Sequence, residues 1–238
     1  SRIKQYIRDG HVYQINFSQR FEADFNADPT ELFLSQSLYN PSPYAAYIDG
    51  GDYKVVSSSP ELFVNVSRGV ITTKPIKGTR PRLSGRHDAE RINNRNVRKL
   101  LECRKEQAEL NMIIDLERND ITKVCEYGSI EVFEPRHIEA YPTVFHALDA
   151  IRGKLRIKPQ GSGFCDIIKA MFPGGSITGA PKIRAMNIID QLEPTARGLY
   201  TGCVGYVGFG NNASLNIAIR TIIIRDSIAF AQTGGGIV

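Results

Sequence analysis

Short segments in which hydrophobic and polar residues alternate recur along the chain, and this pattern is typical of strands with one buried face. The alternation is clearest at residues 13–21, where Tyr13, Ile15 and Phe17 fall on one side and polar residues on the other. Because most of these segments are joined by short turns, an antiparallel sheet is predicted. The predicted strands span residues 13–21, 44–48, 53–58, 61–66, 70–76, 203–209, 214–225 and 228–233.

Three stretches have helical rather than alternating periodicity. Asp28 and Pro29 are suited to the N-cap and first position of one helix, which is predicted to end before the prolines that follow residue 40. In the longest stretch, Val97, Leu101 and Ala108 recur at helical spacing and predict a buried stripe. The predicted helices span residues 28–40, 88–117 and 182–192.

The composition is that of a globular chain without a membrane span. Of 238 residues, 42% are hydrophobic, and no apolar run approaches the roughly 20 residues that a transmembrane helix needs. No signal peptide opens the sequence, and no membrane partner is expected. The four cysteines lie far apart without a CxxC pair, which argues against a zinc cluster or a disulfide framework and favours a reducing, cytoplasmic setting.

Positive charge is concentrated in one part of the sequence. Between Lys74 and Lys105, eleven lysines and arginines stand against three acidic residues, within a net charge of +5. Nucleic acid is one possible partner for such a segment. No helix-turn-helix, RNA-binding or zinc-finger signature accompanies it, so a small polyanionic substrate or a solvated helix face is favoured and no nucleic-acid partner is expected.

The most informative stretch surrounds Lys77, which follows an apolar run and precedes Gly78. The glycine allows a tight turn and a close approach of the backbone to a ligand. Arg80 and Arg82 supply fork-shaped donors suited to carboxylates. A partly desolvated lysine near other cations can serve as a nucleophile. The plain alternative is a strand that ends in a basic surface turn.

Glu61 and His146 are candidates for proton transfer. Glu61 opens a predicted strand sixteen residues before Lys77, and a hairpin between them would bring both positions onto one region of the sheet. A carboxyl there could act as a general acid, although an exposed glutamate at the start of a strand is the usual alternative. His146 stands among apolar residues and is more often a hydrogen-bonded core histidine than a ligand or catalyst.

Two further patterns suit anions and metals. Residues 172–182 form a glycine-rich loop that runs into a helix, where free N–H groups can bind a phosphate or a carboxylate, but the loop is no Walker A motif. Glu102, Glu106 and Glu109 fall on one face of the predicted long helix, where salt bridges or a Mg²⁺ site explain them equally well. On the predicted strand 214–225, Arg220 could receive an anion or form a strand-edge ion pair.

Eight short motifs, taken in order, resemble the chorismate-utilising enzyme family over essentially the whole chain. Each is weak alone, but eight in the family's order make a chance resemblance very improbable. The motifs are Tyr13-Gln14-Ile15-Asn16, Asn40-Pro41-Ser42-Pro43-Tyr44, Ser59-Pro60-Glu61, Pro75-Ile76-Lys77-Gly78-Thr79-Arg80, the block 108–120, the loop 172–182, Ile219-Arg220-Thr221 and Gly234-Gly235-Gly236.

The resemblance implies an α+β fold: an antiparallel β-sandwich flanked by helices, with the active site between the sheets. It implies one chorismate-binding catalytic domain over residues 1–238, without the amino-terminal region and the extreme carboxy-terminal segment of the family. The family's second Mg²⁺-ligating glutamate is not found before Val238, so the activity of this chain by itself is left open.

Two positions bear on the reaction. Family members that make anthranilate usually hold alanine at the position of Lys77, whereas those that make 4-amino-4-deoxychorismate hold a lysine that attacks the chorismate ring. Gln14 stands where members that add water to chorismate place a lysine. The expected reaction is therefore chorismate plus ammonia, with ammonia supplied by a glutamine amidotransferase partner. Anthranilate formation is the alternative, and a basic nucleic-acid-binding module is the remote one.

The resemblance also assigns roles to individual residues. Glu61 would protonate the departing hydroxyl, His146 would lie close to the substrate ring, and Glu109 would bind Mg²⁺, which would hold a substrate carboxylate. The other expected substrate-binding residues are Gln14, Thr79, Thr178, Tyr206, Arg220, Gly234 and Gly235.

Overall fold

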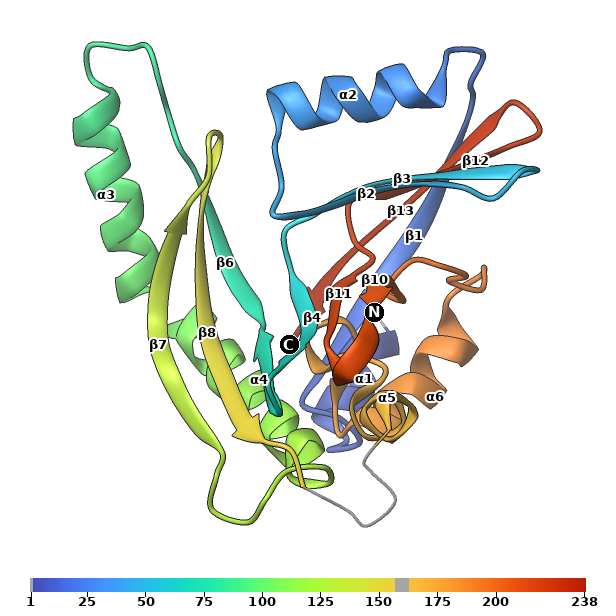
Figure 1. Ribbon diagram of the computed structural model, residues 1–238. Helices are drawn as coiled ribbons and strands as arrows, with labels where there is room; N and C mark the ends of the chain where they lie inside the picture. The colour runs from blue at the N-terminus through green and yellow to red at the C-terminus, as the bar shows by residue number, and fades with distance from the viewer. Residues whose placement is uncertain (1, 157–162) are drawn as a thin grey trace. The chain divides into compact units, whose positions relative to one another are not determined.

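The structure is a computed structural model that describes residues 2–156 and 163–238, and within it the chain divides into two units (Figure 1). Neither unit is continuous in sequence, because the chain leaves the first unit and returns to it twice. Unit 1 comprises residues 1–60, 173–205 and 216–238, and unit 2 comprises residues 61–172 and 206–215.

Unit 1 is built on a six-stranded sheet with the order β2-β3-β12-β13-β1-β9. The long strands β1 and β13 pair antiparallel from Ile15↔Ile237 to Asp24↔Ile228 and run side by side in Figure 1. The strands are β1 (Gln14–Asp24), β2 (Tyr44–Asp49), β3 (Tyr53–Ser59), β9 (Gly179–Ala180), β12 (Thr221–Arg225) and β13 (Ile228–Ile237).

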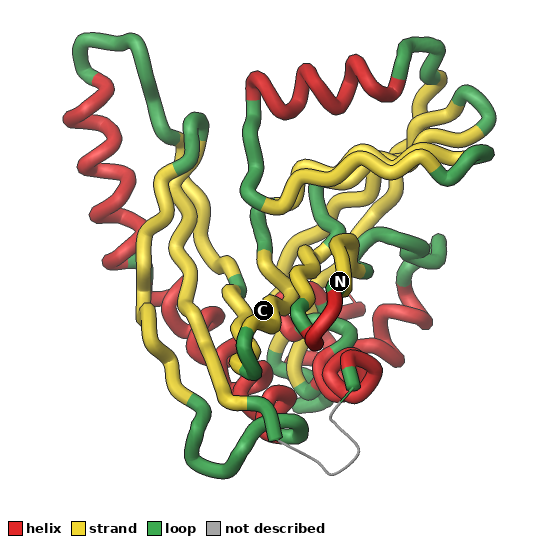
Figure 2. The backbone as a smooth tube through the Cα atoms, in the orientation of Figure 1, coloured by secondary structure: helices red, strands yellow, loops and turns green. Residues whose placement is uncertain are grey.

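Helices of unit 1 cover this sheet, and α2 packs along β3 (Figure 2). The start of α2 is as the sequence predicts, because the Asp28 side chain accepts a hydrogen bond from the Thr30 amide at 2.8 Å. A cluster of buried residues joins α1, α6 and β1 and includes Ile3, Ile15 and Ile188. The helices are α1 (Arg2–Arg8), α2 (Pro29–Tyr39) and α6 (Lys182–Leu192), with a 3-10 turn, η1, at Gly175–Ile177.

A second sheet has the order β10-β11-β4-β5-β8-β6, and β7 pairs with β8 outside this path. The central strand β8 pairs antiparallel with β5, β6 and β7. The chain passes from one unit to the other within β10 and within β11. The strands are β4 (Leu62–Ser67), β5 (Val70–Lys74), β6 (Ile76–Pro81), β7 (Glu131–Ala140), β8 (Val144–Lys154), β10 (Cys203–Val207) and β11 (Ala213–Ile217).

In unit 2, α3 and α4 pack against β6 and β8 (Figure 2). Leu100 of α3 meets Phe145 and Ala147 of β8 in a buried apolar cluster. None of the helices in the described ranges is long and apolar enough to cross a membrane. The helices are α3 (Ala89–Glu102), α4 (Arg104–Thr122) and α5 (Phe164–Met171), with a 3-10 turn, η2, at Phe209–Asn211.

The expected α+β class with antiparallel sheets and flanking helices is confirmed, but the continuous helix over residues 88–117 is wrong. Cys103 has an extended backbone (φ −71°, ψ 98°) and separates α3 from α4. The helical phase is therefore reset after residue 103, so that Ala108 is exposed while Leu110 is buried. Leu101, on α3, is exposed as well, and its neighbour Leu100 is the buried residue there. Glu102 consequently does not share a helix with Glu106 and Glu109.

Two strand predictions are also corrected. Residues 70–76 contribute to two strands, β5 and β6, and residues 214–225 form β11 and β12, which belong to different sheets. The chain passes between the sheets at residues 218–220, where Arg220 adopts a left-handed conformation (φ 48°). The irregular segment 132–153 forms most of the long strands β7 and β8. Because β8 is buried at nearly every position, it lacks the alternation that identifies a half-buried strand.

Candidate active site

Lys77 lies at an irregularity in β6. Ile76 pairs with Leu148 and Thr79 with His146, so β6 has one residue more than β8 between these pairs. Lys77 and Gly78 occupy this bulge, and bulges re-aim side chains next to functional sites. Gly78 adopts φ 105°, and a Cβ on it would lie 2.9 Å from Oε2 of Glu106. The positive φ favours glycine, since residues with a side chain rarely adopt it.

Lys77 lines a small cavity on the side of β6 that faces α3 and α4. Its volume is about 10 Å³, enough for one water molecule. Glu106 Oε2 and Arg136 Nη1 are buried there without a hydrogen-bond partner among the described residues. The lysine thus has a carboxylate and a guanidinium in its surroundings. The lining consists of Lys77, Leu100, Leu101, Glu106, Gln107, Leu110, Arg136 and Ala147.

Glu61, the residue before β4, approaches the same strand. It is 4% exposed, and its Oε1 accepts a hydrogen bond of 3.4 Å from the amide of Ile76, the residue before Lys77. The structure therefore brings the Glu61 carboxylate to the backbone beside Lys77. Glu61 does not belong to the described lining of the Lys77 cavity, so the two side chains do not share that cavity.

His146 and Thr79 form a directly bonded pair. Thr79 Oγ1 and His146 Nδ1 lie 2.9 Å apart, across the register pair of β6 and β8. His146 is 1% exposed, and its ring packs edge to face on Tyr141. The hydrogen-bonded core histidine expected as the plain alternative is thus observed. The role of His146 beside a substrate ring stays a prediction.

Glu109 lies on α4, partly buried and 3.6 Å from Lys105. Glu106, one turn earlier, accepts a hydrogen bond from Arg80 Nη1 at its Oε1, and its buried Oε2 has no hydrogen-bond partner among the described residues. Mg²⁺ commonly takes one or two protein carboxylates and completes its shell with water and substrate oxygens. The two glutamates fit this donor set. Within residues 2–156 and 163–238, no group of three acidic, histidine or cysteine side chains forms a complete metal site.

In unit 1, Gln14 is enclosed between β9 and β13. It is 1% exposed and pairs with Ala180, and a Cβ on Gly236 would lie 2.6 Å from its Nε2. Its Oε1 is buried without a hydrogen-bond partner in the described part of the chain. A buried amide oxygen without a donor is costly, and such exceptions are characteristic of functional sites.

The glycine-rich loop holds Thr178 beside β1. The Thr178 hydroxyl donates to the Gly174 carbonyl at 2.9 Å, and the Thr178 carbonyl accepts from the Asn16 amide at 2.8 Å. Gly179 has φ 150°, and a Cβ there would lie 2.1 Å from the backbone oxygen of Gln14. The loop is therefore fixed against the strand that carries Gln14.

The remaining expected residues differ in their surroundings. A Cβ on Gly234 would lie 2.6 Å from the Phe17 oxygen, whereas Gly235 has open space. Arg220 is exposed at the crossing between sheets. Tyr206, in unit 2, is 65% exposed.

A tyrosine that was not expected, Tyr200, lies next to Gly234: its hydroxyl is 3.0 Å from a Cβ built on that glycine. The sequence patterns gave no signal for Tyr200, because this contact joins segments far apart in the chain.

Asp149 was also missed by sequence reasoning. It is 5% exposed on β8, and its Oδ1 accepts from the Arg136 amide at 2.5 Å. Burial raises the pKa of Asp149, while the hydrogen bond and the charge of Arg136 act in the opposite direction. A carboxyl with a raised pKa is common near functional sites, and Arg136 also lines the Lys77 cavity.

Replacing Asp149 by asparagine is expected to remove part of the pH dependence of stability. Because its pKa is raised, Asp149 contributes stability below about pH 4 that is lost as the pH rises through the folded-state value. The free energy of unfolding of the wild type should fall relative to that of Asp149→Asn as the pH rises from about 4 through the folded-state pKa, because the buried carboxyl then loses its proton.

Urea denaturation at several pH values measures this difference. Asp115→Asn is the matched control, because the Asp115 side chain is 79% exposed and its ion pair with Arg118 is long, at 3.9 Å. Parallel profiles for the wild type and Asp149→Asn would contradict the role of burial at residue 149.

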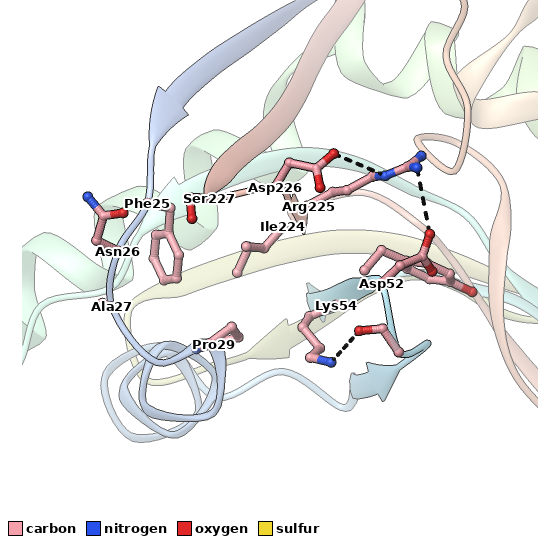
Figure 3. Close-up of a pocket in the computed structure, with 12 residues that line it drawn as sticks. Phe25, Asn26, Ala27, Pro29, Asp52, Lys54, Ile224, Arg225, Asp226 and Ser227 are labelled. Atoms are coloured by element: carbon pink, nitrogen blue, oxygen red, sulfur yellow. Dashed lines mark hydrogen bonds and ion pairs between the residues drawn. The ribbon is translucent and has the colours of Figure 1, made fainter.

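A separate pocket in unit 1 holds none of the expected site residues. It has a volume of about 310 Å³ and lies at the tips of the strand turns (Figure 3). Arg225 in its wall is paired with Asp52 and Asp226 at 3.6 and 3.4 Å (Figure 3). The positive charge of Arg225 is therefore neutralised by these two aspartates.

Comparison with known proteins agrees with these features. Residues 1–238 match the family model described as chorismate binding enzyme. The chain is 43% identical over 237 residues to aminodeoxychorismate synthase component 1 of Bacillus subtilis (strain 168), covering 100% of this chain and 49% of that protein. It is 44% identical over 237 residues to anthranilate synthase component 1 of Aquifex aeolicus (strain VF5), covering 100% of this chain and 47% of that protein.

The fold agrees as well. The crystal structure of anthranilate synthase component I from Streptococcus pneumoniae TIGR4 superimposes with a TM-score of 0.88 at 36% identity, covering 100% of this chain and 51% of that one. The chain thus spans about half the length of the relatives it matches. The family match covers both antiparallel sheets and the motifs on them. The chain belongs to the chorismate binding enzyme family.

Proposed function

We propose that the protein converts chorismate and ammonia to 4-amino-4-deoxychorismate, as an aminodeoxychorismate synthase of folate and p-aminobenzoate biosynthesis. The observation that supports this most is Lys77 at the bulge of β6, with the Glu61 carboxylate bonded to the adjacent amide of Ile76. An amine nucleophile and a carboxylic acid are the two groups that the displacement of a poor leaving group requires, one to attack and one to supply a proton.

In this mechanism, the neutral amine of Lys77 adds to the chorismate ring while the C4 hydroxyl departs. Glu61 supplies a proton, so that the hydroxyl leaves as water. Ammonia then adds to the ring, and the Lys77 amine leaves with its bonding electrons. The net change is the replacement of one hydroxyl by one amino group, with release of water.

The other residues of unit 2 support this chemistry. Thr79 holds the His146 ring through the 2.9 Å hydrogen bond, which fixes the orientation of the imidazole. Glu109, with Glu106 one turn earlier, would hold Mg²⁺, and the bound metal would neutralise a substrate carboxylate. Tyr206 keeps the substrate-binding role that the resemblance gives it.

The residues of unit 1 would bind and orient. The unpartnered Oε1 of Gln14 is an acceptor suited to an N–H of incoming ammonia. Thr178 would contact the ring, and Arg220 with the open backbone at Gly235 would receive carboxylates. Gly234 keeps its expected role through its backbone, since no side chain fits there.

Ammonia would come from a glutamine amidotransferase partner. Releasing ammonia from glutamine needs a reactive thiolate, and burial raises the pKa of Cys125 to about 11, which keeps that thiol protonated. Burial also raises the pKa of Cys203. A reducing, cytoplasmic setting is part of this proposal, because the four cysteines are widely spaced in the sequence.

Anthranilate formation is the second candidate, because relatives of both kinds are similarly close at 43% and 44% identity. Product analysis distinguishes the two. Full-length protein incubated with chorismate, Mg²⁺ and an ammonium salt should give a product that retains the enolpyruvyl group, detected by chromatography and mass spectrometry. Anthranilate fluorescence without an added lyase would overturn the proposal.

A further inference from the structure

A buried ion pair lies in unit 1 after the end of α6. Arg197 bonds Glu193 through two parallel contacts, Nη2 to Oε1 at 2.7 Å and Nε to Oε2 at 2.9 Å. The two side chains are only 14% and 4% exposed. A buried ion pair is weak evidence for stability, because desolvation offsets most of the attraction. Its other hydrogen bonds are therefore the better guide to its role.

The shorter of those hydrogen bonds go to segments that carry expected site residues. Arg197 donates through Nη1 to the Ile177 carbonyl at 2.8 Å and through Nη2 to the Asn16 carbonyl at 2.6 Å. Glu193 Oε1 accepts from the amide and the hydroxyl of Ser18 at 2.9 and 2.8 Å. One ion pair thus joins the glycine-rich loop to β1.

The same network extends to β13. The Ser18 hydroxyl also accepts from Gln232 Nε2 at 2.9 Å, and Ser18 is the register partner of Gly234. On the loop side, the Ile177 carbonyl is part of the peptide bond that leads into Thr178. The partners Ile177, Asn16 and Ser18 thus lie within four residues of Thr178 or Gln14, and Arg197 makes further contacts with the Thr201 hydroxyl at 3.4 Å and with the Tyr200 ring.

We propose that Glu193 and Arg197 are positioning residues that fix Thr178, Gln14 and Gly234 in one arrangement for chorismate. This inference rests on the proposed use of chorismate by this site, not on which product forms. Arginine is suited to the task because its planar fork serves two carbonyls and a carboxylate at once, which the single ammonium of lysine cannot do. Preorganisation of this kind acts on the reaction rate more than on folding.

Arg197→Lys tests the proposal in the full-length protein. The lysine keeps the charge pair with Glu193 but loses the simultaneous hydrogen bonds to Ile177 and Asn16. We expect kcat/KM for chorismate consumption to fall by about tenfold to about a hundredfold. The measurement is made at a temperature where urea denaturation shows both proteins to be fully folded, so that a loss of stability alone would leave kcat/KM per folded protein unchanged.

Arg225→Lys is the matched control, because it makes the same change in the same unit at an exposed ion pair (Figure 3). Its kcat/KM should equal that of the wild type. If Arg197→Lys fails to fold, Glu193→Gln provides the second variant. The side-chain oxygen of the glutamine still accepts hydrogen bonds from Ser18, but the neutral amide no longer forms an ion pair with Arg197. It should lower kcat/KM by about tenfold or more.

The outcomes separate the inference from the proposed function. Wild-type protein that does not consume chorismate would remove the proposed function. Wild-type protein that consumes chorismate, together with folded variants of Arg197 and Glu193 that keep wild-type kcat/KM, would overturn the positioning role alone.

Discussion

Replacing Lys77 by alanine in the full-length protein is expected to lower the rate of 4-amino-4-deoxychorismate formation by about a thousandfold or more, or to redirect the reaction to another product. The reason is that alanine cannot form the covalent bond to the ring that the proposed mechanism needs. The rate and the product are measured with chorismate, Mg²⁺ and ammonium, by chromatography coupled to mass spectrometry.

Lys77→Arg separates nucleophilicity from charge. Arginine keeps the positive charge but does not deprotonate in proteins, so it cannot serve as a nucleophile. Both variants should therefore lose amination. If charge alone mattered, the arginine variant would keep most of the activity. Urea denaturation of each variant is needed as a folding control. The cavity beside Lys77 has a volume of only about 10 Å³, so a larger side chain has little room there.

A direct observation of the intermediate completes this test. Wild-type protein quenched with chorismate and Mg²⁺, in the absence of ammonia, should gain the mass of chorismate less one water, and Lys77→Ala should not. An alanine variant with the wild-type rate and product would remove the covalent role of Lys77.

Replacing Gly179 by alanine is expected to cost about 3 kcal/mol of folding free energy or more. The added Cβ would lie 2.1 Å from the backbone oxygen of Gln14, and the φ of 150° is itself unfavourable for alanine. Since the clash is with backbone rather than with a flexible side chain, β9 must move away from β1. The midpoint of urea denaturation measures the loss.

Gly235→Ala is the control for this prediction. It lies in the same unit, and a Cβ there meets nothing within 4 Å, so its denaturation midpoint should stay close to that of the wild type. Equal midpoints for Gly179→Ala and Gly235→Ala would contradict the close packing of the glycine-rich loop against β1.

Much of the local structure could be predicted from the sequence. The alternation at residues 13–21 predicted the strand β1, and Asp28 with Pro29 predicted the start of α2. The predicted buried face of that strand is wrong in part, because Tyr13 and Phe21 are exposed while the polar residues Gln14, Asn16 and Ser18 are buried. Both signals are local, because a strand's pleat and a helix cap involve residues next to each other. The family was predicted too, since its motifs are short and their order is visible in the chain.

The candidate site was only partly predictable. The sequence indicated Lys77 and Gly78 but not the bulge that holds them, because a bulge is defined by the register with β8. It placed Glu106 and Glu109 on one helix, which is correct, but continued that helix through Cys103, where the backbone is extended. The helical period continued across residue 103 without a recognisable stop signal.

The sequence by itself determined the family, the class of secondary structure and the residue types available for chemistry. Only the tertiary structure decided which of them meet. Arg197 reaches Asn16 across 181 positions, and Glu193 reaches Ser18 across 175. The burial of Asp149 likewise depends on the strands around it. Contacts of this kind arise from the packing of elements that are distant in the sequence, so the periodicity within a short window of residues cannot predict them.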